Sequence, residues 1–325
     1  MVYFKILSLI ILSVIVGFPL FAQQEIDSNY IRRFEKNNVL EIYPGVYSTR
    51  FNFSQPKDRQ NNYRLVANSS GFVGVYFGYK WLSLKYSWAI PGTELAKKVR
   101  LQSRSLGISF GNREWSFRPF YNTYDGLLVP EDPGNREFRV FRDIKFSDAG
   151  VDILYILNTT QFSFRAANSF SERQVKSRGS VFIKLTPMWQ KVNWELPSRD
   201  VITDSTTYDL LAYDPEWFSI ISRIGYSYNY VLKNNRWSIA PAILIGGGAL
   251  KEINTGVDHL QLVTDIQAWI RCGYSISNYY IYFTGRWGHL QTNLFIKNLR
   301  QVNTNFSITG GYRFGNLKKK LLRLL

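Results

Sequence analysis

The most regular pattern in the chain is the alternation of apolar and polar residues from His259 to Ile276. Thr264 alone interrupts the apolar face, which consists of Leu260, Leu262, Ile266, Ala268, Ile270, Cys272, Tyr274 and Ile276. A period of two residues is typical of an extended strand. The run exceeds the roughly 9–11 residues that a tilted strand needs to cross a bilayer, whereas soluble strands have about 5–6. The pattern therefore predicts a membrane-spanning β-strand.

Similar strand-like runs recur along the chain, at residues 39–54, 68–79, 81–89, 103–111, 114–122, 146–157, 160–170, 179–187, 217–231, 236–249, 279–289 and 302–314. Short polar turns such as Ser277-Asn278 alternate with longer connections, and the segments 123–145 and 188–216 are predicted to be outer loops. Single-chain bacterial barrels have an even number of strands. We therefore predict an all-β fold, a transmembrane antiparallel β-barrel of about 12 strands (10–14). The thirteen runs give 14 strands if Gln190 to Leu196 adds one, or 12, the preferred number, if one run is not a membrane strand.

The two ends of the chain differ from the repeated strands. Lys5 precedes a nearly unbroken apolar run from Ile6 to Val16, which is typical of a secretory signal peptide. We assign residues 1–22 to a signal peptide, 23–38 to a periplasmic N-terminal lead, 39–314 to the barrel and 315–325 to a basic C-terminal tail. These features predict the cell outer membrane of a Gram-negative envelope as the location. The run 302–314 is similar to the terminal strand that barrel-assembly machinery recognises, although the tail after it departs from that pattern.

Charge and composition narrow the partners. The chain has 40 Lys and Arg against 24 Asp and Glu, a net charge of +16, and a mean hydropathy of -0.18. Alternating strands explain this low hydropathy, because half of each strand faces a polar interior. In an exported barrel the positive charge favours outer-membrane lipids and a small anionic solute over nucleic acid as partners. The single cysteine, Cys272, excludes an intrachain disulfide.

Eight basic residues fix the direction in which the strand faces point. Each lies opposite the apolar face of its run, as Lys85 lies opposite Leu82 and Leu84. Placing Lys or Arg against lipid costs roughly 2–4 kcal/mol at the midplane, so these side chains are expected to point inward. The predicted lumen-lining bases are Lys85, Arg118, Arg165, Lys184, Arg223, Arg271, Arg286 and Arg313.

Few acidic residues share the inward face, chiefly Asp152 and Asp265. One hypothesis is that the interior is strongly electropositive and attracts anions. The other is that loops fold inward, plug the lumen and neutralise the bases with the acids Glu131, Asp132, Glu137, Asp143 or Asp214. A barrel of about twelve strands is small enough to be filled by side chains and loops, so the sequence leaves both hypotheses open.

Catalysis is not expected from this sequence. His259 and His289 lie near strand ends, and no serine stands in a nucleophile-elbow context that would pair it with either histidine. No Cys/His cluster or acidic loop predicts a metal, and no cofactor is expected. Gly246-Gly247-Gly248 opens no helix, so it is a flexible bend or a tight packing site rather than a phosphate cradle. A lipid hydrolase or acyltransferase stays as the enzymatic alternative.

Several motifs resemble a bacterial family of exported proteins catalogued as domain of unknown function 4421. They are the segments 27–31, 77–84, 162–167, 171–180 and 224–230. The resemblance implies an outer-membrane β-barrel with no assigned activity. Its most distinctive part joins two strands and contains Glu172, Gln174, Lys176, Ser177, Gly179 and Ser180. Either this loop folds onto the barrel mouth, with Gln174 and Lys176 bonding lumen groups, or it contacts a ligand.

Together these observations predict a porin-like role, either envelope structure or the passage or binding of small anionic or lipid-like molecules. Two alternatives belong to other classes. One is an outer-membrane lipid-modifying enzyme, and the other is a surface adhesion or recognition module that uses the long loops.

Overall fold

The computed structural model describes residues 26–54, 63–67, 71–80, 82–96, 103–132, 137–194, 214–254, 259–294 and 298–316. The predicted signal peptide and nearly all of the basic C-terminal tail lie outside these residues. The assignment of both segments stays a prediction.

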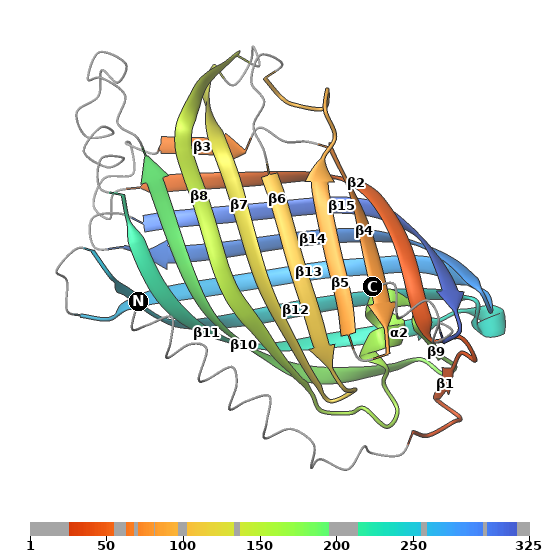
Figure 1. Cartoon of the computed structure of the whole chain (residues 1–325). Coiled ribbons are helices and arrows are strands. Elements are labelled where there is room, and N and C mark those ends of the chain that lie inside the picture. The colour runs from red at the N-terminus through yellow and green to blue at the C-terminus, as the bar shows by residue number, and fades with distance from the viewer. Residues whose placement is uncertain are drawn as a thin grey trace, which may run out of the picture.

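Twelve strands form a closed antiparallel barrel, which confirms the predicted fold and the preferred strand number (Figure 1). The barrel strands are β2 (Asn38–Ser54), β4 (Gly71–Tyr79), β5 (Leu82–Ala89), β6 (Ser103–Gly111), β7 (Trp115–Asp132), β8 (Glu137–Ile156), β10 (Arg178–Trp194), β11 (Glu216–Val231), β12 (Trp237–Glu252), β13 (Gln261–Ser275), β14 (Tyr279–Asn293) and β15 (Asn298–Phe314). Pairing of β15 with β2 closes the ring. Asn38 secures this seam, because its amide donates to the Gly315 carbonyl at 3.0 Å and accepts from the Lys80 N–H at 2.9 Å.

Tight polar turns connect most strands at one end of the barrel, which we call the short-turn end. The Asn112 side chain accepts hydrogen bonds from the N–H groups of Glu114 and Trp115 between β6 and β7. Asn234 and Asn235 adopt positive φ angles of 69° and 54° between β11 and β12, a conformation that asparagine tolerates well. The opposite end is the long-loop end.

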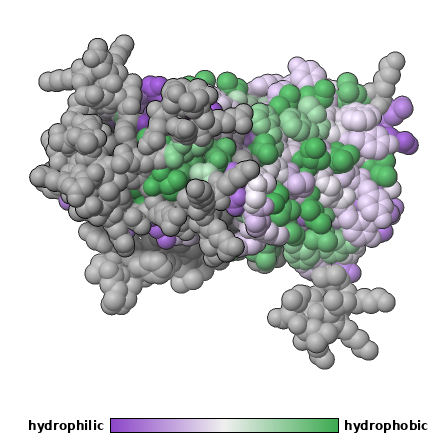
Figure 2. Space-filling view, turned by 90° about the horizontal axis from the view of Figure 1, so that it is seen from above, coloured by the Kyte–Doolittle hydropathy of each residue, from purple (hydrophilic) through white to green (hydrophobic). Residues whose placement is uncertain are grey.

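The middle of the outer wall is apolar, as the alternation predicts. Its exposed side chains include Leu40, Ile42, Val46, Leu84, Ile183, Leu185, Ile220, Ile224, Ile243, Ile245, Ile281, Phe283, Phe306 and Ile308. Figure 2 shows hydrophobic side chains over much of the coloured wall in view, with hydrophilic residues at the right-hand end. Outward aromatic pairs such as Trp237–Tyr274 and Tyr279–Tyr312 lie at the short-turn end. An apolar band flanked by aromatic residues is the surface that a lipid bilayer requires.

One predicted strand is wrong. Residues 160–170 contain the helix α2 (Phe164–Ser169), which Ser163 caps by accepting a hydrogen bond from Ala166 N–H at 2.9 Å, and which ends at Phe170 with a φ of 52°. The alternation of Phe162, Phe164 and Ala166 imitates a strand, but the cap and local packing favour a helical turn. No helix among the described residues is long and apolar enough to cross a membrane.

The segment containing α2 folds into the short-turn mouth of the barrel. After α2 comes the short strand β9 (Glu172–Gln174), which pairs with β1 (Ile31–Arg33) from the N-terminal lead. Figure 1 shows α2 and β9 at the end of the barrel where β15 finishes. We call residues 157–177 the plug.

The predicted outer loops are also partly wrong. Residues 123–132 and 137–145 continue β7 and β8, and residues 188–194 continue β10, while 195–213 lie outside the described residues. These extensions escaped prediction because the polarity of the two faces reverses near the long-loop end. On β2, Phe51 and Phe53 are buried inside while Arg50 is exposed outside, the arrangement of a soluble barrel rather than of a membrane wall.

A further short strand, β3 (Tyr63–Ala67), narrows the barrel at the long-loop end. It pairs with Arg50–Phe53 of β2 on one side and with β7 on the other. At this end β3 therefore takes the place of the shorter strands β4, β5 and β6 between β2 and β7. The ring at that end consists of ten strands: β2, β3, β7, β8, β10, β11, β12, β13, β14 and β15. Barrel diameter falls with strand number, so side chains fill this end more easily.

The direction of the faces can be tested on two adjacent residues of β15. Ile308 points outward with an exposed fraction of 55%, whereas Ser307 points inward. We expect Ile308→Lys to destabilise the folded barrel in lipid vesicles by about 2–4 kcal/mol, because it places a charge against hydrocarbon. Ser307→Lys should cost much less. Urea unfolding followed by heat-modifiable gel migration measures both, and equal costs would contradict the assignment of the faces.

Candidate functional site in the barrel interior

The interior of the long-loop half is filled by apolar side chains. This apolar cluster consists of Phe51, Phe53, Leu65, Ala67, Leu127, Ile144, Phe146, Met188, Val192, Trp217, Ile221, Leu250, Val263, Leu294 and Leu299. All of these residues are buried, and Tyr124 packs against Phe51 and Phe146 at ring distances of 5.9 and 6.1 Å. Buried polar side chains, among them Gln190, Glu252 and Gln301, lie on the same inward face beside this cluster. Close packing of the described side chains narrows the lumen in this half.

A belt of paired charges crosses the middle of the interior. Asp152 accepts from Arg118 at 3.0 Å and from the Thr186 hydroxyl at 2.8 Å, and its carboxylate lies 3.6 Å from the Lys184 ammonium. Lys184 also donates to Gln267 at 3.1 Å. These residues lie on β7, β8, β10 and β13, so the belt links strands that are not neighbours in the sheet.

The second part of the belt is the buried ion pair between Arg223 on β11 and Asp265 on β13. β12 lies between these strands, and Gly246 is the register partner of both residues. A Cβ at Gly246 would lie 2.7 Å from Cγ of Arg223, so only glycine leaves room for the ion pair. The Gly246–Gly248 segment is therefore a tight packing site within β12.

Between the belt and the plug lies a space that water can enter. Lys85 and Arg286 have exposed side chains, and the Arg118 side chain is 50% exposed, although all three belong to the inward face. Lys85 lies over the Tyr43 ring at 4.6 Å, and Arg286 lies over the Trp269 ring at 5.9 Å. We call this space the basic chamber.

The basic residues around the chamber are only partly compensated. Lys85, Arg118, Arg271 and Arg286 are close enough to repel one another electrostatically. Lys85, Arg271 and Arg286 form no ion pair with an acidic residue of the described ranges. The buried Glu41 supplies negative charge nearby, but its carboxylate accepts from the Tyr280 and Tyr282 hydroxyls at 2.7 and 3.0 Å.

The plug closes the chamber at the short-turn end. Phe162 and Ala167 pack against the inner wall in a buried apolar cluster with Leu154, Ile156, Phe182, Ala240, Ala242 and Leu244. Asn168 at the end of α2 accepts hydrogen bonds from Arg271 and, at 3.1 Å, from Trp269. The plug thus contacts both the wall and the edge of the chamber.

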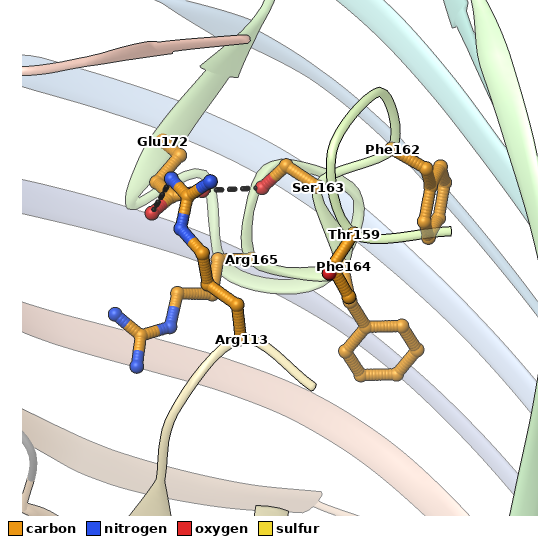
Figure 3. A pocket seen from close by; sticks show the side chains of 7 residues that line it. All are labelled: Arg113, Thr159, Phe162, Ser163, Phe164, Arg165 and Glu172. Carbon is orange, nitrogen blue, oxygen red and sulfur yellow. Dashed lines mark hydrogen bonds and ion pairs between the residues drawn. The ribbon is translucent and has the colours of Figure 1, made fainter. Parts of the chain in front are cut away.

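An ion pair joins the plug to the turn between β6 and β7. Glu172 accepts from Arg113 at 2.7 Å and from the Ser163 hydroxyl at 2.6 Å, as Figure 3 shows. Burial lowers the pKa of Arg113, and the neighbouring Glu172 carboxylate opposes that shift. The pocket beside this contact has a volume of about 10 Å³, which is room for a single water molecule.

Arg165 belongs to the plug rather than to a barrel strand, which corrects its predicted position. It lies on α2, and Figure 3 shows its side chain beside that of Arg113. The positive charges of Arg165 and Arg113 repel each other, and the charge of Arg165 also acts electrostatically on Tyr76 of β4. Arg165 therefore adds positive charge to the plug side of the chamber.

Arg313 connects the last strand to the plug. It is fully buried, and its guanidinium donates to the Phe170 carbonyl, to the Ser275 hydroxyl at 2.8 Å and to the Ile276 carbonyl at 2.7 Å. Its guanidinium carbon also lies 3.6 Å from the centre of the Phe34 ring in the N-terminal lead. Arg313 is thus a structural clamp and does not line the open part of the lumen.

The polar residues of the family-motif loop hold the plug in place. Gln174 donates to the carbonyls of Tyr30, Gln161 and Lys176, and accepts from the Ser163 N–H at 2.9 Å. The Lys176 ammonium lies 5.4 Å from the centre of the Tyr30 ring.

The remaining motif residues act at the end of the loop. The Ser177 hydroxyl accepts from Val231 N–H, and the Ser180 hydroxyl accepts from Asn158 N–H, at 2.9 and 3.0 Å. Gly179 leaves space for the Tyr226 hydroxyl, which would lie 2.2 Å from a Cβ. These contacts give the motif a structural role at the barrel mouth.

The plug consists of residues 157–177, and neutralisation of the basic residues by the predicted loop acids stays a prediction. The side chains of Glu131, Asp132, Glu137 and Asp143 lie outside the described residues, and Asp214 lies beside Glu216 at the long-loop end. Sequence analysis missed Glu41, although it follows the same alternation with Leu40 and Ile42 that places it inward. It also missed Arg113 and Asn168, because their roles depend on the fold of the plug.

The candidate catalytic residues are not brought together. His289 lies on the outward face of β14, with its ring 6.1 Å from that of Trp287, whereas Ser219 lies inward and donates to the Met188 carbonyl at 3.4 Å. The described residues contain no group of His, Cys, Asp and Glu side chains that could hold a metal ion.

The space that Gly246 provides can be tested. We expect Gly246→Ala to destabilise the barrel by about 1–3 kcal/mol, because the methyl group would meet the Ser222 carbonyl and push Arg223 from Asp265. Gly310→Ala is the matched control, since no atom lies within 4 Å of its Cβ position. Urea titration of both variants in detergent measures the difference, and equal stabilities would contradict the proposed crowding.

Comparison with solved structures gives low similarity over most of the chain. The beta domain of the Bordetella autotransporter Brka is 11% identical with a TM-score of 0.44, covering 85% of this chain and 99% of that one. The translocator domain of autotransporter NalP from Neisseria meningitidis is 10% identical with a TM-score of 0.40, covering 96% of both chains. OmpT of Vibrio cholerae is 8% identical with a TM-score of 0.32, covering 87% and 100%.

These similarities transfer no activity to this chain. No curated protein matches it. The profile of a protein family described as Domain of unknown function (DUF4421) matches residues 25–314, which is nearly the whole chain and includes every described strand. The chain belongs to the DUF4421 family.

Proposed function

We propose that this protein is an outer-membrane β-barrel that binds small anionic molecules in the basic chamber, with the plug controlling access. The observation that carries the proposal is the inward position and exposure of Lys85, Arg118 and Arg286. Cations that repel one another in a confined, water-accessible space attract a counter-anion, because their field is focused by the surrounding wall. The apolar band on the outside supports the membrane location.

The orientation follows from the two ends of the barrel. Bacterial outer-membrane barrels keep short turns and chain termini on the periplasmic side. The N-terminal lead and the end of β15 both lie at the short-turn end, where β1 pairs with the plug. We therefore place the plug at the periplasm and propose that anions reach the chamber from that side.

Passage through the whole barrel demands a second opening, because the apolar cluster fills the long-loop half. Binding needs only the plug to move. Conductance in planar bilayers separates the two roles: an anion-selective current indicates passage, whereas anion binding without current indicates a binding protein. No catalytic step and no cofactor are part of the proposal, and outer-membrane lipids and the barrel-assembly machinery are its proposed partners.

Neutralising the chamber tests the binding role. We expect Lys85→Gln/Arg286→Gln to weaken binding of pyrophosphate or succinate by at least about tenfold, because hydrogen bonds to a charged group contribute roughly 1.5–3 kcal/mol each. Isothermal titration calorimetry of the full chain in detergent measures the affinity. Lys145→Gln/Lys251→Gln, on the outward face, removes the same charge and should leave the affinity unchanged. Equal affinities of both double variants would overturn the proposal.

Releasing the plug tests its control of access. Asn305 faces inward beside Arg286, so Asn305→Cys in a Cys272→Ala background reports the arrival of a charged thiol reagent in the chamber. We expect Glu172→Ala to accelerate labelling about tenfold or more, because it leaves Arg113 buried without its partner.

Glu114→Ala is the matched control in the same turn. It removes a carboxylate whose side chain takes part in no described contact between the turn and the plug. Labelling that is equally fast in all three proteins would show that the plug does not limit access.

A further inference from the structure

Three arginines form an exposed patch on the outer wall at the long-loop end. They are Arg50 on β2, Arg64 on β3 and Arg300 on β15, and all three side chains are exposed. They point away from the lumen, because their neighbours Phe51, Leu65 and Leu299 are buried in the apolar cluster inside. Neither the basic chamber nor the charged belt includes them. We call these residues the arginine patch.

Strand register brings the three residues close together. Asn52 of β2 is paired with Arg64 on one side and with Arg300 on the other. With strands 4.7–4.9 Å apart, the Cα atoms of Arg64 and Arg300 are roughly 10 Å from each other. Arg50 is two residues from Asn52 on the same face, which is a distance of roughly 7 Å. Asn52 therefore lies between three guanidinium groups.

No acidic residue of the described ranges compensates the patch. Arg50, Arg64 and Arg300 form no ion pair there, in contrast to Lys191, whose ammonium lies 3.3 Å from Glu216 on the same outer wall. The charge of Arg50 acts on Arg64, and that of Arg300 acts on His289 of β14. Mutual repulsion of this kind is relieved when an anion binds.

The position of the arginine patch along the barrel axis indicates which kind of anion it binds. On β15 the outward side chains Ile308 and Phe306 belong to the apolar band, and Arg300 follows beyond them toward the long-loop end. On β14 the outward Trp287 is followed by His289. The patch thus begins where the apolar band ends, at the level of lipid head groups.

We propose that the arginine patch binds the phosphate groups of lipid A in the outer leaflet. The proposal rests on the orientation given under the proposed function, which places the long-loop end at the outer leaflet. Arginine suits this ligand, because its planar guanidinium donates two parallel hydrogen bonds to a phosphate. The carboxamide of Asn52 adds a donor at the centre of the patch.

Titration of the full-length folded barrel with lipid A in detergent tests the proposal, with native mass spectrometry as the measurement. Each basic residue near a charged surface contributes about fivefold in affinity, so Arg50→Gln/Arg64→Gln/Arg300→Gln should weaken binding about 100-fold. Lys80→Gln/Arg32→Gln/Arg236→Gln removes the same charge at the short-turn end and should bind like the unmodified protein. Lipid A without its phosphates should bind weakly to all three proteins.

The outcomes separate this inference from the proposed function. Equal binding by both triple variants, or equal binding of lipid A with and without phosphate, would overturn the patch as a lipid A site. The proposal would also be overturned if the patch bound inorganic phosphate but did not bind lipid A. Arg300→Lys keeps the charge and the fold but loses the paired hydrogen bonds, and a several-fold weaker affinity is expected. Succinate binding in the chamber should be the same in every one of these variants, so the two proposals fail independently.

Discussion

A cation enclosed by the barrel wall must have an anionic partner, hydrogen bonds or water, because a bare buried charge costs far more than the fold can supply. Each level of the interior meets this constraint differently. Arg223 has Asp265, Lys184 and Arg118 share Asp152, and Arg313 donates to carbonyl and hydroxyl oxygens. Lys85 and Arg286 form no ion pair among the described residues and have exposed side chains. Their exposure distinguishes the basic chamber from the rest of the interior.

The plug and the taper of the barrel define the two boundaries of that chamber. At one boundary the change from twelve to ten strands brings the walls closer, and the described wall residues pack an apolar cluster into the lumen. At the other boundary the wide ring needs a separate element, and α2 with β9 supplies it. The two ends are narrowed by different means, and the plug is held both by buried apolar packing and by polar contacts.

Much of the fold was predictable, because a bilayer imposes a simple rule on every second residue. The alternation gave the barrel, the twelve strands and the inward direction of Lys184, Arg223 and Arg271. This rule applies only to residues within the bilayer. The extensions of β7, β8 and β10 lie beyond it and were not predicted. The plug was not predicted for another reason. Its alternating Phe162, Phe164 and Ala166 fit a strand as well as a helix, and the Ser163 cap together with packing against the wall favours the helix. Gly246 shows the same limit, since its role is visible only once Arg223 and Asp265 are known to face each other across it.

Arg313 connects closure of the barrel with docking of the plug and the N-terminal lead. It lies in β15, the strand that closes the ring against β2, yet its side chain also contacts Phe170 of the plug and Phe34 of the N-terminal lead. In a ring that closed before those two segments docked, the Arg313 guanidinium would keep its hydrogen bonds to Ser275 and Ile276 but lack the Phe170 carbonyl and the Phe34 ring. Closure of the ring between β15 and β2 and docking of the plug and the N-terminal lead are therefore thermodynamically linked. Each of the two is more favourable once the other has occurred, because Arg313 contacts both the wall and the plug.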